Sequence, residues 1–112
     1  MPMMFGFARH RRQLLEGELA RMLPELAPFG ALRAYLVGDL ARGVVGPESE
    51  LELLLVQETA EPFRRRPDFW TAHLRPKCGA RFLVYTPEEF ETLADEDRIL
   101  VAAQRWGEAL LG

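Results

Sequence analysis

The first quarter of the chain carries apolar residues at a helical spacing. From Arg9 onward they recur every three or four positions, at Leu15, Leu19, Met22, Leu23 and Leu26. This spacing places them on one face and predicts an amphipathic helix that packs on the rest of the protein. Pro24 and Pro28, followed by Gly30, predict the end of this helix, because proline lacks an amide proton and restricts the residue before it.

Three shorter apolar runs predict strands, at residues 32–37, 51–56 and 80–85. The first run ends at Gly38. The second is almost continuous leucine, which is typical of a strand buried on both faces in the middle of a sheet. Between these two strands, residues 39–49 contain glycine and proline and predict a turn that includes one helical turn at residues 40–42.

Three more helices are predicted in the second half of the chain. Residues 67–75 form the first of them. The next begins at Thr86 as its N-cap, with Pro87 at the first helical position and Glu89 completing a capping box. The last covers residues 97–111, where a helical stripe contains Leu100, Ala103, Gly107, Leu110 and Leu111.

The order of these elements predicts a single α/β domain over residues 1–112, with helices flanking a small mixed sheet of three or slightly more strands. The chain has 48% hydrophobic and 28% charged residues, and no apolar run approaches the roughly 20 residues of a membrane span. Its formal net charge of −3 argues against general nucleic-acid binding, which requires a basic surface. We therefore expect neither a membrane nor a nucleic acid as partner.

The lone Cys78 cannot form an internal disulfide, and the first basic residues follow only a very short apolar patch, unlike a secretory signal. Both features predict a cytoplasmic protein. Four aromatic residues are predicted to lie in the core: Trp70, Trp106, Phe82 and Phe90. The arginine runs at residues 9–12 and 64–66 are predicted to be solvated surface.

Glu50 and Glu52 stand at alternate positions beside the leucine-rich strand. Side chains alternate along a strand, so both carboxylates point to the same side of the sheet. Two carboxylates on one face repel one another unless a positive charge lies near them. Either a divalent cation or an arginine can supply that charge.

The order of strand, glycine, short helical turn and carboxylate-bearing strand suits nucleotidyl transfer, because glycine admits a phosphate and paired carboxylates hold Mg²⁺. The matching residues are Gly38, residues 41–43 (Ala-Arg-Gly) and residues 49–53 (Ser-Glu-Leu-Glu-Leu). With the later YTPEEFETL at residues 85–93, they make the chain resemble the minimal nucleotidyltransferases of the DNA polymerase beta superfamily. The resemblance covers nearly the whole chain.

This resemblance implies a nucleotidyltransferase fold with Mg²⁺ and ATP as cofactors. Glu50 and Glu52 would be the catalytic and metal-binding residues, and the nucleotide site would be lined by Gly38, Asp39, Arg42 and Ser49. An active member would transfer AMP from ATP to a hydroxyl of a protein or small molecule. Many small members of the family pair with a helical protein in toxin–antitoxin modules, so such a partner is also implied. The sequence leaves the formation of a homo-oligomer open.

The departures from the family pattern fall in the motif itself. Asp39 replaces a serine, Glu50 and Glu52 replace two aspartates, and Arg81 stands on the strand where a third carboxylate is expected. Glutamate keeps the charge but is one methylene longer, which the tight ~2.1 Å shell of Mg²⁺ accepts poorly. A carboxylate at Asp39 repels phosphate by about 1 kcal/mol in water and about 4 kcal/mol where the site is partly buried.

Two hypotheses follow from these departures. In the first, Arg81 takes the place of the metal and pairs with Glu50 or Glu52, which leaves an inactive fold that binds a nucleotide or a partner. In the second, Asp39 joins Glu50 and Glu52 in a rebuilt metal site of an active enzyme. We favour the first hypothesis.

Overall fold

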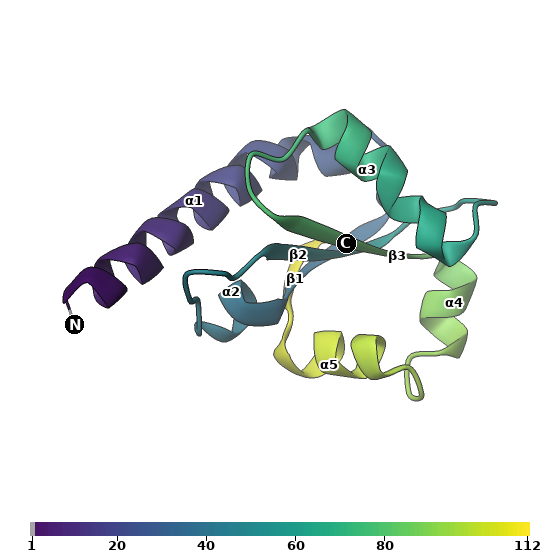
Figure 1. Ribbon diagram of the computed structural model, residues 1–112. Coiled ribbons are helices and arrows are strands. Elements are labelled where there is room, and N and C mark those ends of the chain that lie inside the picture. The colour runs from purple at the N-terminus through teal and green to yellow at the C-terminus, as the bar shows by residue number, and fades with distance from the viewer. Residues whose placement is uncertain (1) are drawn as a thin grey trace.

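The structure is a computed structural model that describes residues 2–112, with side chains described from residue 6 onward. Helices are interspersed with four strands along the chain (Figure 1). In chain order they are α1 (Pro2–Leu26), β1 (Arg33–Val37), α2 (Gly38–Arg42), β2 (Leu51–Val56), the 3₁₀ helix η1 (Phe63–Arg65), α3 (Arg66–Leu74), β3 (Ala80–Tyr85), α4 (Pro87–Thr92), α5 (Arg98–Trp106) and β4 (Glu108–Leu111).

The four strands form one mixed sheet in the order β3-β2-β1-β4. β1 is antiparallel to β2 and β4, whereas β2 and β3 are parallel. The register pairs Glu52 with Val37 on one side and with Arg81 on the other. The predicted α/β fold with a small mixed sheet is therefore confirmed, and the register brings the end of β1, the start of β2 and the start of β3 together.

One face of the sheet is covered by α1 and α3, which lie together on the same side (Figure 1). The core between them contains Leu15 and Met22 of α1, Leu53 of β2 and Trp70 of α3, all with 0% exposure. The Trp70 indole Nε1 donates a hydrogen bond to Gln57 Oε1 at 3.0 Å. This layer is the hydrophobic centre of the molecule.

A buried carboxylate ties α1 to the loop that follows α3. Arg21 donates two hydrogen bonds of 3.0 Å to Glu18, and the backbone amide of Lys77 donates another of 2.6 Å. These hydrogen bonds outweigh the cost of burial and lower the pKa of Glu18 to about 2. The ionised carboxylate therefore holds this layer in place.

The opposite face of the sheet carries the short helices α4 and α5 (Figure 1). Leu54 and Val56 of β2 pack there with Tyr85 of β3 and with Leu100 and Ala103 of α5. The predicted capping box at the start of α4 is confirmed, because Glu89 N–H donates to the Thr86 hydroxyl and Thr86 N–H donates to the Glu89 carboxylate.

The first helix ends in the region that the sequence predicts, at Leu26 before Pro28, although α1 continues through Pro24. The proline leaves one carbonyl of the preceding turn, that of Ala20, without an amide donor, and Ala20 is exposed to solvent, which can satisfy that group.

The predicted helix over residues 97–111 ends at Trp106, and residues 108–111 form β4. β4 pairs with the free edge of β1, with Glu108 opposite Leu36 and Leu111 opposite Ala34. Leu110 and Leu111 therefore pack on the core as strand residues, and pairing with β1 overrides their helical spacing. Among the described helices, none combines the length and the apolar character that crossing a bilayer requires.

Candidate functional site

Gly38 forms a corner where β1 passes directly into α2. Its φ of 77° lies in the left-handed region that favours glycine. A Cβ atom at this position would overlap the side-chain carboxylate of Glu52, so the carboxylate occupies the space that any other residue would fill. Glycine is therefore required here both for the backbone turn and for the close approach of Glu52.

Arg81 supplies a positive charge beside Glu52. The parallel register places the two residues side by side on β2 and β3, and Arg81 Nη1 lies 3.7 Å from Glu52 Oε1. The Arg81 side chain is 59% exposed and that of Glu52 is 23% exposed. The predicted pairing of Arg81 with a motif glutamate is thus present, as a loose ion pair at a half-open site.

Glu50 does not line the hollow that Glu52 lines and has a different contact. It precedes β2, is exposed, and packs over Gly79, where an added Cβ would lie 2.8 Å from Glu50 Oε2. Glu52 lies against Gly38 and Arg81. The two motif glutamates therefore have separate neighbours, Gly79 for Glu50 and the pair Gly38 and Arg81 for Glu52.

Asp39 and Ser49 are joined to each other. The Ser49 hydroxyl donates a hydrogen bond of 2.7 Å to Asp39 Oδ2 and accepts one of 2.8 Å from the amide of Gly46. These bonds link α2 to the loop before β2. Asp39 and Ser49 line a hollow that also includes Gly46 and Glu48, whereas Glu52 lines a different one.

This donor set does not fit a Mg²⁺ site. Mg²⁺ takes oxygen ligands in a near-octahedral shell. Glu52 is the carboxylate at the Gly38 corner, and its cationic neighbour is a guanidinium. Across the part of the chain that the structure describes, no group of three or more His, Cys, Asp or Glu side chains is arranged to hold a metal ion.

The hollow beside Glu52 is cationic. It has a volume of about 300 Å³ and lies between the Gly38 corner and α5. Arg42 of α2, Arg81 of β3 and Arg98 of α5 line it, together with the single carboxylate of Glu52. Three guanidinium groups against one carboxylate give this pocket a formal charge of +2, although the whole chain carries −3.

Trp106 forms an aromatic wall of the same pocket. Its side chain is 58% exposed, and the Arg42 guanidinium lies 6.0 Å from the centre of its ring. The prediction that Trp106 belongs to the core is therefore wrong, whereas Trp70 and Phe82 are buried as expected. Sequence reasoning missed Trp106 and Arg98 as site residues, because both depend on where α5 lies against the sheet.

Two anchors fix α5 against the sheet. At its start, Asp97 Oδ1 accepts hydrogen bonds from the amides of Ile99 and Leu100 and from the Tyr85 hydroxyl of β3, the last at 3.1 Å. Burial and the neighbouring Asp97 carboxylate raise the pKa of Tyr85, which keeps the phenol protonated as a donor. Arg98, the next residue, is thereby held at the pocket.

At the end of α5, Gly107 allows the chain to turn into β4. A Cβ there would lie 2.5 Å from the carbonyl oxygen of Ala103 and 3.2 Å from that of Leu36. Only glycine permits this close approach of the helix end to β1, and Gly107 lines the pocket with Gly38.

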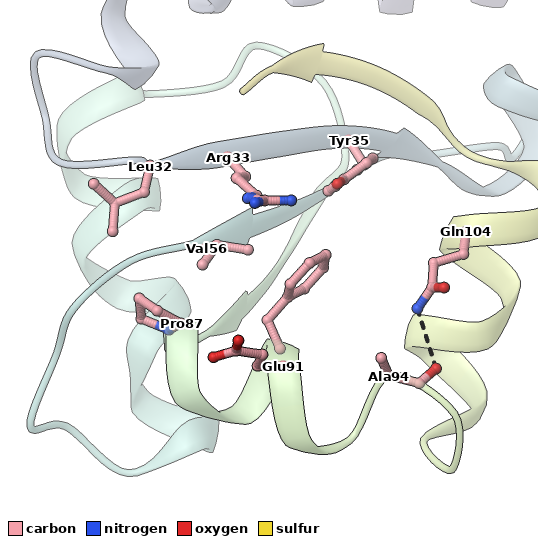
Figure 2. Close-up of a pocket in the computed structure, with 9 residues that line it drawn as sticks. Leu32, Arg33, Tyr35, Val56, Pro87, Glu91, Ala94 and Gln104 are labelled. Atoms are coloured by element: carbon pink, nitrogen blue, oxygen red, sulfur yellow. Dashed lines mark hydrogen bonds between the residues drawn. The ribbon is translucent and has the colours of Figure 1, made fainter.

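A second hollow lies over the other half of the same sheet face (Figure 2). It has a volume of about 530 Å³ and an apolar lining that includes Leu32, Val56 and Pro87. The Phe90 ring stacks on Tyr35 at 5.8 Å, and the Arg33 guanidinium lies 5.5 Å from the Phe90 ring centre. Arg33 and Glu91 contribute one charge of each sign, so this second hollow has no excess charge.

Comparisons with known proteins do not assign this chain to a family, so its class is described from its fold and its site. The chain matches no protein-family model, and no curated protein is significantly similar to it. The fold and the site define a small α/β protein with a mixed sheet and an arginine-lined pocket at the glycine corner between its first strand and the following helix.

Proposed function

We propose that this protein is a binding module on a nucleotidyltransferase-type fold and that it does not transfer nucleotides. The observation that carries the proposal is the pairing of Glu52 with Arg81 at the Gly38 corner. The sequence resemblance assigns this place to Mg²⁺ between carboxylates. A guanidinium in its place balances the charge of Glu52 but provides no Lewis acid for a phosphate oxygen.

Electrostatics supports this assignment. Arg81 Nη1 lies 3.7 Å from the carboxylate that a metal would need. Two unit positive charges about 4 Å apart repel by about 1 kcal/mol in water and by about 4 kcal/mol near a partly buried site, and a divalent ion doubles the repulsion. A cation at Glu52 must therefore displace Arg81 before it can bind.

The residue on β3 opposite Glu52 points in the same direction. A transferase needs a group that accepts the proton of the attacking hydroxyl. The resemblance places that group on β3, where this chain has Arg81 at the position that faces Glu52. Arginine stays protonated in proteins and cannot serve as a general base.

A transfer assay with labelled ATP, Mg²⁺ and a cell lysate tests the proposal. We expect no labelled acceptor, and no increase in melting temperature at millimolar Mg²⁺ or Mn²⁺. Arg81→Gln is the informative variant: removal of the guanidinium should allow weak metal binding, and Glu52→Gln should not. Labelling of an acceptor by the wild-type protein, lost in Glu50→Ala or Glu52→Gln, would instead establish an active nucleotidyltransferase.

A helical protein partner is a further part of the proposal, because the resemblance to toxin–antitoxin nucleotidyltransferases implies one. The exposed Val101 and Trp106 on α5 offer apolar surface for such a contact. Co-expression with the product of the neighbouring gene, followed by size-exclusion chromatography, tests for a stable complex. Two separately eluting proteins would remove the partner from the proposal.

A further inference from the structure

We infer that the cationic pocket binds a nucleoside monophosphate without a metal ion, with the phosphate between Arg42 and Arg98 and the base against Trp106. This inference rests on the proposed function and names the ligand of the same site. The inference goes beyond the proposed function in one respect. A transferase binds a nucleoside triphosphate together with Mg²⁺, whereas the ligand inferred here is neutralised by the arginines of the protein alone.

The first argument is the charge that remains after internal pairing. Arg81 is paired with Glu52, whereas Arg42 and Arg98 form no ion pair among the described residues. Two free guanidinium groups therefore line the pocket. A phosphate monoester carries a charge of about −1.5 to −2 at neutral pH, which two guanidinium groups match. A triphosphate carries about twice that charge and ordinarily needs a cation.

The second argument is geometry. Guanidinium groups form bidentate hydrogen bonds with phosphate oxygens. Arg42 and Arg98 approach the pocket from different helices, α2 and α5. Because α5 is anchored by Asp97 to Tyr85, the spacing of the two arginines is set by the fold. Gly38 and Gly107 line the same pocket, and the space beside each is already filled, by the Glu52 carboxylate at Gly38 and by two backbone carbonyls at Gly107.

The third argument is the exposed aromatic wall. Trp106 is 58% exposed although tryptophan is usually largely buried, and it lies at the rim of a pocket with two free cations. A nucleobase stacks on an indole ring irrespective of its identity. The volume of about 300 Å³ is at the small end of ligand sites, which favours one base, one sugar and one phosphate.

The second hollow provides the internal contrast. It also holds an arginine over an aromatic ring, Arg33 over Phe90, but Glu91 balances its charge. Phe90 is stacked on Tyr35, so its ring is already partly covered. The same residue types are thus present in both hollows, and of the two the pocket at α5 has the charge excess, with Arg42 and Arg105 beside its exposed Trp106 ring.

Isothermal titration of the full chain with AMP in EDTA tests the inference. We expect saturable binding at micromolar to submillimolar concentration, unchanged when EDTA is replaced by Mg²⁺. Adenosine alone and inorganic phosphate alone should each bind at least tenfold more weakly, because each lacks one half of the ligand. The absence of saturable AMP binding up to several millimolar would overturn the inference, as would binding that requires Mg²⁺.

Variants locate the site. Arg42→Gln, Arg98→Gln and Trp106→Ala should each weaken AMP binding by about tenfold. All three side chains are exposed, so circular dichroism and thermal melting should show unchanged folding. Arg33→Gln is the matched control, because it removes the same charge from the second hollow, and it should change the affinity by less than twofold. Equal loss in Arg33→Gln would overturn the assignment to this pocket.

Two further measurements separate the possible failures. A 5′-phosphorylated single-stranded oligonucleotide should bind no more tightly than AMP, and tenfold tighter binding would replace the free nucleotide with a nucleic-acid end. If the ATP assay detects transfer while AMP still binds in EDTA, the proposed function fails and this inference stands. If neither transfer nor AMP binding is found, the inference alone fails.

Discussion

The two faces of the sheet are covered in different ways. Over one face, α1 and α3 meet above a continuous core in which Leu15, Met22 and Trp70 have no exposure. Over the other, α4 and α5 have six and nine residues and leave two hollows beside them. Because side chains alternate along a strand, neighbouring residues serve opposite faces: Leu53 fills the core and Glu52 faces the pocket.

This comparison predicts that stability and the proposed ligand binding are separated across the sheet. The face under α1 and α3 holds a buried, fully hydrogen-bonded carboxylate, Glu18. The face under α5 holds a loose ion pair, Glu52 with Arg81, in a half-open pocket. Substitutions on the first face should therefore change the free energy of unfolding, and those on the second should change ligand affinity.

Two tryptophans provide the largest contrast. Trp70→Ala removes a fully buried indole and its hydrogen bond to Gln57, and should cost about 3–5 kcal/mol of unfolding free energy. Trp106→Ala, at 58% exposure, should cost less than about 1 kcal/mol while weakening AMP binding. Urea unfolding measures both variants. Similar costs for the two would contradict the separation of the faces.

Two glycines with nearly the same backbone conformation distinguish the cost of backbone strain from the cost of disturbing Glu52. Gly38 and Gly43 have φ values of 77° and 74°, but an added Cβ meets Glu52 at position 38 and no atom within 4 Å at position 43. Gly43→Ala should cost about 1 kcal/mol. Gly38→Ala should cost about 2–3 kcal/mol and alter AMP affinity, since Glu52 must move. If Gly38→Ala and Gly43→Ala had equal unfolding free energies and equal AMP affinities, the close approach of Glu52 to Gly38 would be excluded.

Glu18 should make the stability of the first face depend on pH. Its pKa in the folded protein is about 2, below the ordinary 4.5, so its contribution is present above about pH 4.5 and is lost as the pH falls towards 2. Glu18→Gln should cost about 1–2 kcal/mol at pH 7 and flatten this acid limb. Glu25→Gln is the control, because Glu25 lies 3.8 Å from the same Arg21 but its side chain is 43% exposed. If the loss of stability at low pH persisted in Glu18→Gln, that loss would arise from other carboxylates.

Substitution of Glu52 should have the smallest effect on stability and should change the AMP affinity in a defined direction. Its ion pair with Arg81 is 3.7 Å long, and the Arg81 side chain is 59% exposed, so Glu52→Gln should change the unfolding free energy by less than about 0.5 kcal/mol. The variant should bind AMP two- to fivefold more tightly, because the pocket loses its negative charge. A metal-dependent site would instead lose affinity in the same titration.

The local parts of the fold were predictable from the sequence. β2 and β3 have the predicted bounds, and the capping box from Thr86 to Glu89 is where the pattern placed it. These features depend on alternation, continuous apolar runs and short-range hydrogen bonds. The motif reasoning also gave the Gly38 corner and the Arg81 side chain as the charge facing a glutamate.

The remaining parts depend on contacts that are distant in the sequence. Residues 108–111 form a strand because they pair with the edge of β1, which lies some 75 residues earlier in the chain. Arg66 lies in an arginine run predicted to be solvated, but it is buried and pairs with Glu89 at 2.6 Å. Trp106 and Arg98 reach the pocket through the position of α5. Spacing within one segment contains no information on such partners.

The pairing of β4 with β1 has a consequence for the order of assembly. α5, which contributes Arg98 and Trp106, is followed directly by a strand whose neighbour in the sheet is β1, the strand that leads into Gly38. The pocket is thus closed by the contact between two of the most widely separated segments of the fold, and closing so long a loop is slow. A folding chain that has already built its core under α1 and α3 still lacks the arginine-lined pocket until its last strand docks.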